Sequence, residues 1–196
     1  MLENIFSTPI EHLGVKDTVF ICEVNRLNQL TTITENQNDY FKNNWMPDND
    51  TTPTTFGSQN NILGDHEYLK NFIERKAEGY LDNVGADYTK VRINNSWFNK
   101  QTKSQSVGFH NHRDVNFPQT ISGVFYVRAT SDPDQGKIAF KSPNPFDCEF
   151  PSKLSNIKYN CEVKFLAIQN NLMFFPSTII HKVTPNYTEN ERIVLS

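Results

Sequence analysis

Histidines and an arginine in the second half of the chain have the types and spacing of a metal site with an anion-binding group beside it. His110 and His112 are separated by one residue, and Asp114 follows at the same interval. Alternate side chains of a β-strand point to one face, so they can reach one ion. His181 and then Arg192 follow downstream. Such donors bind one face of Fe(II) and leave its other positions open for a cosubstrate and oxygen, so the pattern predicts a mononuclear iron centre.

The sequence leaves two ligand sets open. One is His112, Asp114 and His181, which provides two imidazoles and a carboxylate, and the other is His110, His112 and His181. An H-x-H or H-x-D triplet alone is a weak signal, since a histidine near a strand end often only contacts solvent or backbone. His181 follows an apolar strand that ends at Pro176 and a short turn, so we expect it on the next strand of a rolled sheet.

Arg192 begins an apolar run that continues to Ser196. An unpaired guanidinium buried on such a strand is costly, so it must have an anionic partner. A bound dicarboxylate provides one through a bidentate contact, and an Asp or Glu of the protein is the alternative.

Short β-type runs separated by turn residues occupy the chain after Gly85, and no helical pattern lies between them. Many short strands without intervening helices favour a sandwich or barrel of antiparallel sheets, and we expect a jelly roll. A long loop is expected over Pro143–Asn160. The expected strands are Tyr88–Trp97, Val107–His112, Ile121–Ala129, Lys137–Lys141, Val163–Ile168, Leu172–Phe175, Ile180–Thr184 and Arg192–Ser196.

A supporting helix is predicted over residues 66–82, because apolar residues recur there at helical spacing between charged ones. Asp65 is the expected N-cap, and Gly85 follows the last periodic residue. Residues 1–65 are polar and rich in turn residues, so an irregular segment that wraps the core is expected. Within it, Val19–Val24 reads as an edge strand and Asn25–Tyr40 as a weak helix.

Length and composition favour one domain over residues 1–196, with the core at 86–196 and the helical part at 66–85. The net charge of -3 and the lack of a Lys/Arg cluster make nucleic acid an unexpected partner. No window is apolar enough to cross a bilayer, and no secretory signal is evident. Three cysteines without C-x-x-C spacing are expected as free thiols, so we expect a soluble cytoplasmic protein.

Several motifs taken together resemble a known family. They are Ser96-Trp97-Phe98-Asn99, His110-Asn111-His112, Ser122-Gly123-Val124-Phe125-Tyr126-Val127, Phe175-Pro176-Ser177 with His181-Lys182-Val183, and Glu191-Arg192-Ile193. In order and approximate spacing, residues 50–196 resemble the 2-oxoglutarate- and Fe(II)-dependent oxygenases found in marine phages and bacteria, which are related to prolyl hydroxylases.

The resemblance implies a double-stranded β-helix, a mainly β jelly roll, that binds Fe(II) and takes 2-oxoglutarate as cosubstrate. It implies iron ligands at His110, His112 and His181, and a distal carboxylate held by Arg192 and Tyr126. Asn99 is a further candidate for the cosubstrate. The substrate would be a peptidyl residue or a small molecule that becomes hydroxylated, in a host cytoplasm if the chain is of phage origin.

The chain departs from the family between Arg113 and Ile121, where its loop is longer and the usual proline after the second histidine is absent. Asp114 therefore remains an alternative ligand to His110. Two other functions also stay open. One is a three-histidine, cupin-like metalloenzyme that needs no 2-oxoglutarate, which would not require Arg192, and the other is a non-catalytic jelly-roll binding module.

Overall fold

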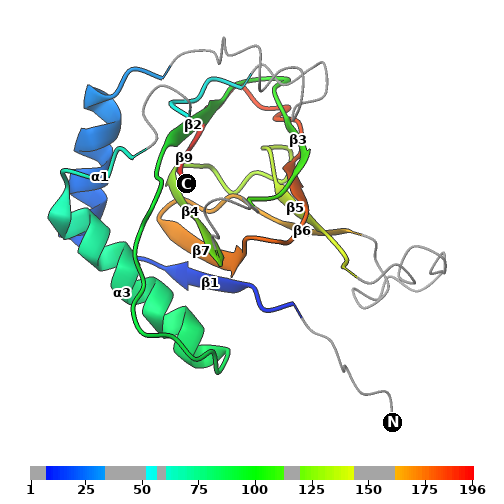
Figure 1. Cartoon of the computed structure of the whole chain (residues 1–196). Coiled ribbons are helices and arrows are strands. Elements are labelled where there is room, and N and C mark those ends of the chain that lie inside the picture. The colour runs from blue at the N-terminus through cyan, green and yellow to red at the C-terminus, as the bar shows by residue number, and fades with distance from the viewer. Residues whose placement is uncertain (1–7, 34–51, 57–60, 113–119, 144–161) are drawn as a thin grey trace.

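The computed structural model describes residues 8–33, 52–56, 61–112, 120–143 and 162–196. In these residues two antiparallel sheets face each other, and two helices cover the outer face of the larger sheet (Figure 1). The strand order is β1-β7-β4-β9-β2 in the larger sheet and β3-β8-β5-β6 in the smaller one. Most neighbours in a sheet are distant in sequence, as in a rolled double-stranded β-helix, so the predicted mainly β jelly roll is confirmed.

Short strands with loops between them build both sheets. Their bounds are β1 Glu11–Gly14, β2 Phe98–Gln101, β3 Val107–His110, β4 Ile121–Arg128, β5 Ile138–Lys141, β6 Glu162–Phe165, β7 Asn171–Pro176, β8 His181–Val183 and β9 Arg192–Leu195. The helices are α1 Thr18–Leu30 and α3 Glu67–Asn83.

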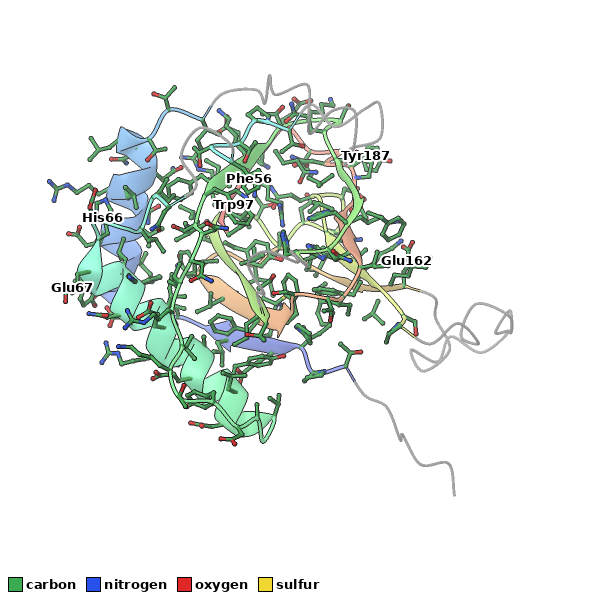
Figure 2. All side chains as sticks on the ribbon, viewed as in Figure 1. Phe56, His66, Glu67, Trp97, Glu162 and Tyr187 are labelled. Carbon is green, nitrogen blue, oxygen red and sulfur yellow. The ribbon has the colours of Figure 1, made fainter. Side chains whose placement is uncertain are left out.

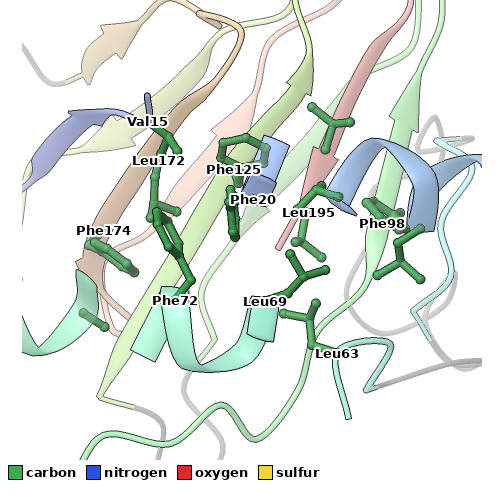
Figure 3. Close-up of a cluster of buried hydrophobic side chains, with 14 of the residues drawn as sticks. Val15, Phe20, Leu63, Leu69, Phe72, Phe98, Phe125, Leu172, Phe174 and Leu195 are labelled. Carbon is green, nitrogen blue, oxygen red and sulfur yellow. The ribbon is translucent and has the colours of Figure 1, made fainter. Parts of the chain in front are cut away.

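The strand alternation of the larger sheet divides the apolar residues between two cores. Phe125, Phe174 and Leu195 face the helices and pack there against α1 and α3 (Figure 3). Tyr126 and Val194, the neighbours of Phe125 and Leu195 along their strands, face the smaller sheet and belong to the second core. The inner faces of the two sheets therefore enclose an interior that is separate from the helix-packed layer.

The predicted supporting helix is confirmed as α3, which buries Leu69, Phe72, Ala77 and Tyr80. The helix ends at Asn83, and Gly85 follows it as expected, with φ 68° and its N–H donated to the Asp82 carbonyl at 3.1 Å. The N-terminal prediction was wrong. His66, not Asp65, occupies the N-cap position, and no side chain caps the helix there.

The segment read as an edge strand at Val19–Val24 is helical instead, as part of α1. The Asp17 side chain accepts a hydrogen bond from the Phe20 N–H at 2.9 Å, which caps the helix. Phe20, Val24 and Leu27 recur at helical spacing and are all buried. The expected helix over 25–40 therefore begins earlier and ends at Leu30.

Three further expectations need correction or fall outside the described residues. Tyr88–Trp97 is not a strand, because regular pairing with β9 begins only at Phe98. The N-terminal part is less irregular than expected, since it provides β1 and α1. Most of the predicted loop over Pro143–Asn160 lies outside the described residues.

Cys22 is a free thiol on the surface. None of the described helices is long and apolar enough to span a membrane.

Candidate metal centre and cosubstrate pocket

His110, His112 and His181 converge at one point between the two sheets. Each offers one ring nitrogen, and these three atoms lie within 4.8 Å of one another. His110 and His181 are directly paired across β3 and β8, and their ring centroids are 4.2 Å apart. His112 lies just beyond the end of β3, with its centroid 5.0 Å from that of His181. Of the two ligand sets left open by the sequence, the structure brings together the three histidines, whereas Asp114 lies outside the described residues.

Hydrogen bonds to backbone carbonyls fix the orientation of two of these rings. The Nδ1 of His110 lies 2.9 Å from the Gly108 carbonyl oxygen, and the Nδ1 of His181 lies 3.0 Å from that of Ile179. A carbonyl can only accept, so each Nδ1 carries the proton and each Nε2 keeps its lone pair. Metal-binding histidines are typically held by such a second contact, so the donor set fits a divalent transition metal such as Fe(II).

The electrostatics of the centre favour neutral imidazoles, the form that binds metals. Burial lowers the pKa of His181 to about 2, and the nearby His110 and His112 add to the shift. Burial, followed by the charge of His110, lowers the pKa of His112 to about 3. Protons therefore do not compete with a metal for these two ligands at neutral pH.

The turn between β7 and β8 positions the histidines. The carbonyl of Ser177 accepts the backbone N–H of His112 at 2.9 Å, and Phe175 packs against the His181 ring with centroids 5.0 Å apart. The Ser177 hydroxyl lies 2.9 Å from that of Ser122 on β4. This turn, which buries Ser177 and Ile179, thus holds both sides of the centre against the larger sheet.

Arg192 and Tyr126 lie together on the inner face of the larger sheet. The Arg192 Cζ is 5.1 Å from the centroid of the Tyr126 ring, and the two residues are 3% and 0% exposed. Neither the Nε of Arg192 nor the hydroxyl of Tyr126 has a hydrogen-bond partner of acceptable geometry. Burial raises the pKa of Tyr126, and the charge of Arg192 opposes this only in part, so the hydroxyl stays protonated and can donate.

Three buried side-chain amides lie around the end of the roll where β9 begins. Gln101 donates to the carbonyls of Gln105 and Thr184 at 2.6 and 2.9 Å. Gln135 accepts from the Thr130 N–H at 2.9 Å. The Asn186 amide donates to the Asn190 carbonyl at 2.8 Å. These amides satisfy backbone groups of the loops at this end of the roll.

Asn99, the remaining sequence candidate, lies opposite Val194, which on its other side is opposite Tyr126. Its Nδ2 donates to the Ser196 hydroxyl at 3.2 Å. Asn99 is thus on the same wall as Tyr126, and β9 lies between their two strands.

Sequence reasoning missed two residues of this region. Trp97 is only partly buried and lies 5.8 Å from His112 between ring centroids, with the Phe56 ring beside it at 4.9 Å and tilted by 60° (Figure 2). Gln101, directly opposite Arg192, was not considered. Its position two residues after Asn99 on one strand was the available signal.

Comparison with known proteins agrees with this geometry. A family model described as "Putative 2OG-Fe(II) oxygenase" matches residues 95–196, which contain the three histidines, Asn99, Gln101, Tyr126 and Arg192. No curated protein sequence matches the chain.

Solved structures of oxygenases share the fold at low sequence identity. A prolyl-4-hydroxylase from Pseudomonas putida matches with TM-score 0.63 and 10% identity, over 96% of this chain and 90% of that chain. A 2OG-Fe(II) oxygenase family member from Burkholderia pseudomallei matches with TM-score 0.63 and 12% identity, over 95% and 82%. The viral collagen prolyl hydroxylase of Paramecium bursaria Chlorella virus-1, solved with 2-oxoglutarate, matches with TM-score 0.57 and 13% identity, over 95% and 92%. Because the family model spans more than half of the sequence, the chain belongs to the family of 2-oxoglutarate- and Fe(II)-dependent oxygenases.

Proposed function

We propose that His110, His112 and His181 hold the Fe(II) of this oxygenase, and that Arg192 and Tyr126 bind the distal carboxylate of 2-oxoglutarate. The convergence of three ring nitrogens supports the metal assignment. Two of the rings also direct Nε2 away from the backbone carbonyl that holds Nδ1, which leaves the metal-binding lone pair available.

The observation that carries the cosubstrate assignment is the state of Arg192. Its guanidinium is buried on the inner face of β9, and no Asp or Glu in the described part of the chain forms an ion pair with it. Burial lowers the pKa of Arg192, which expresses the cost of holding the charge there without solvent. A bound dicarboxylate would offset this cost, with the Tyr126 hydroxyl as a second donor.

Bound Fe(II) would supply the activation of dioxygen, of which one oxygen atom enters a substrate C–H bond as a hydroxyl and the other enters 2-oxoglutarate as it is converted to succinate and CO₂. The residues of this chain bind and orient. The three histidines would hold the metal, and Arg192 would fix the far end of the cosubstrate. Phe140 and Phe175, both buried, pack with His181 and keep water from that side of the site.

For the substrate we propose a peptidyl residue. Trp97 and Phe56 form a partly exposed aromatic wall beside His112, which suits the apolar face of an amino-acid side chain. Two of the similar structures are of prolyl hydroxylases, which makes a prolyl residue the first candidate. We place the reaction in a cytoplasm, since a reducing compartment keeps iron as Fe(II) and Cys22 as a thiol.

An anaerobic titration tests the cosubstrate site. Addition of 2-oxoglutarate to the Fe(II) protein should give a weak visible charge-transfer band. Arg192→Met should weaken 2-oxoglutarate binding about 100-fold, because a bidentate charged contact is worth roughly 3 kcal/mol. Pyruvate has the same keto acid but no distal carboxylate, so its affinity should not change.

Arg128→Met is the matched control, because this arginine is exposed on β4 and pairs with Glu191 at 2.8 Å. It should bind 2-oxoglutarate as the wild type does. If Arg192→Met loses pyruvate and 2-oxoglutarate binding equally, Arg192 is structural and the cosubstrate assignment is wrong.

The substrate proposal is tested by succinate release in air with short peptides. Proline-containing peptides should stimulate succinate formation above the uncoupled rate and gain 16 Da. Trp97→Ala should reduce this stimulation while leaving the charge-transfer band intact. If free small molecules stimulate succinate formation and none of the peptides does, the proposal of a peptidyl substrate is wrong.

A further inference from the structure

We propose that Gln101 is a positioning residue for the cosubstrate: its carboxamide oxygen is the acceptor available to the Nε–H of Arg192, and a contact between them would orient the guanidinium toward the distal carboxylate. This inference rests on the proposed role of Arg192. No motif in the sequence marks Gln101, and its role follows from strand register, burial and unpaired polar atoms.

Strand register places the two side chains together. Gln101 is directly opposite Arg192 in the antiparallel pair of β2 and β9. Directly opposed residues project to the same face of a sheet with Cβ atoms roughly 5 Å apart. Both face the interior, and Gln101 is 1% exposed, so solvent does not reach the space between them.

Hydrogen bonding fixes which way the Gln101 amide points. Its Nε2 donates to the carbonyl oxygens of Gln105 and Thr184. Both partners can only accept, so the nitrogen must be on that side and the oxygen on the other. Oε1 is buried and has no donor, while the Nε of Arg192 is buried and has no acceptor. An orphan acceptor and an orphan donor on paired residues are both costly, and one contact between them removes both costs.

Gly136 makes room for this arrangement. A Cβ added there would lie 2.8 Å from the Cδ and the Nε2 of Gln101, and would overlap Oε1 more closely still. Any other residue at position 136 would force the amide to move. The close approach therefore explains the glycine at position 136 in terms of the Gln101 side chain.

A neutral acceptor suits an arginine that must bind an anion. An acidic residue at position 101 would form an ion pair with Arg192 and neutralise the charge that attracts the cosubstrate. The amide oxygen can hold Nε in place without providing a competing negative charge, which leaves the two terminal nitrogens of the guanidinium for a bidentate contact.

The experiment compares 2-oxoglutarate and pyruvate binding to the anaerobic Fe(II) protein. Gln101→Met keeps the side-chain length and should weaken 2-oxoglutarate binding roughly tenfold, as expected for one lost contact to a charged group. Affinities for Fe(II) and for pyruvate should stay within twofold. Gln101→Glu should weaken 2-oxoglutarate binding more than Gln101→Met does, because its carboxylate competes for Arg192, and it provides a second test if the Met variant does not fold.

Gln135→Met is the matched control. Gln135 is equally buried, and its amide also bonds the backbone of neighbouring loops, but it does not pair with β9. It should lose thermal stability without a change in 2-oxoglutarate affinity. Equal effects of Gln101→Met and Gln135→Met on 2-oxoglutarate would overturn the inference.

The result also separates this inference from the proposed function. If Arg192→Met abolishes the preference for 2-oxoglutarate over pyruvate and Gln101→Met leaves it intact, Arg192 keeps its role and the inference on Gln101 is wrong. If the wild type shows no preference for 2-oxoglutarate over pyruvate, the proposed role of Arg192 and the inference on Gln101 are both wrong.

Discussion

Gln101, Tyr126 and Arg192 provide three of the seven buried side-chain atoms that lack a hydrogen-bond partner in the described residues. All three residues lie on the inner wall of the larger sheet. Folded proteins rarely leave such groups unpaired, because each unpaired group is costly to bury. Their concentration beside a buried cation supports the proposal that 2-oxoglutarate binds here.

The depressed pKa values of His112 and His181 predict a pH dependence of stability in the metal-free protein. The ordinary histidine pKa is 6.5, while the folded-state values are about 3 and about 2. Below pH 6.5 the unfolded chain therefore binds protons that the folded protein excludes, and the free energy of unfolding falls as the pH decreases. Each histidine contributes up to about 1.4 kcal/mol per pH unit.

Urea unfolding between pH 7 and pH 4 measures this slope. His181→Gln should reduce it by about 1.4 kcal/mol per pH unit. Replacement of the partly exposed His66 by Gln is the control and should change the slope less. An unchanged slope in His181→Gln would show that this imidazole is not kept neutral by the fold.

At the scale of elements, α1 and α3 stiffen the sheet that carries Tyr126 and Arg192. Phe20 of α1 stacks on Phe72 of α3 with ring centroids 4.1 Å apart, and its edge contacts Phe125 of β4 at 5.0 Å. The neighbour of Phe125 along the strand is Tyr126, which points to the opposite face. The helix layer therefore supports the wall of the site from behind.

Phe20→Ala should lower the free energy of unfolding by about 3–5 kcal/mol, as expected for a fully buried phenylalanine. Phe109→Ala is the matched control, because Phe109 is exposed on β3, where the Lys182 ammonium lies over its ring in a cation-π pair. It should cost about 1 kcal/mol or less. Similar losses in the two variants, measured by urea unfolding, would contradict the packing described for α1.

The strands that carry the site were predictable because their apolar alternation is local. β4, β7 and β9 lie within a residue or two of the predicted bounds. The run at Val19–Cys22 was misread because four consecutive apolar residues fit a buried strand as well as a helix. Gln101 could not be assigned, since its position opposite Arg192 depends on the long-range pairing of β2 with β9.

At the scale of the whole molecule, the roll brings together groups that are far apart in sequence. His110 and His181 meet because β3 pairs with β8, and Tyr126 meets Arg192 because β4 lies beside β9. The order of strands in the two sheets therefore creates both halves of the site. The family assignment agrees with the predicted oxygenase and not with the non-catalytic jelly-roll binding module.

Anaerobic Fe(II) binding to His110→Ala and to Asp114→Ala tests the three-histidine centre most directly. The account predicts that His110→Ala loses Fe(II) affinity and the charge-transfer band with 2-oxoglutarate, as His181→Ala should, whereas Asp114→Ala keeps both. Retention of Fe(II) by His110→Ala together with its loss in Asp114→Ala would contradict the account and identify a centre of two histidines and a carboxylate.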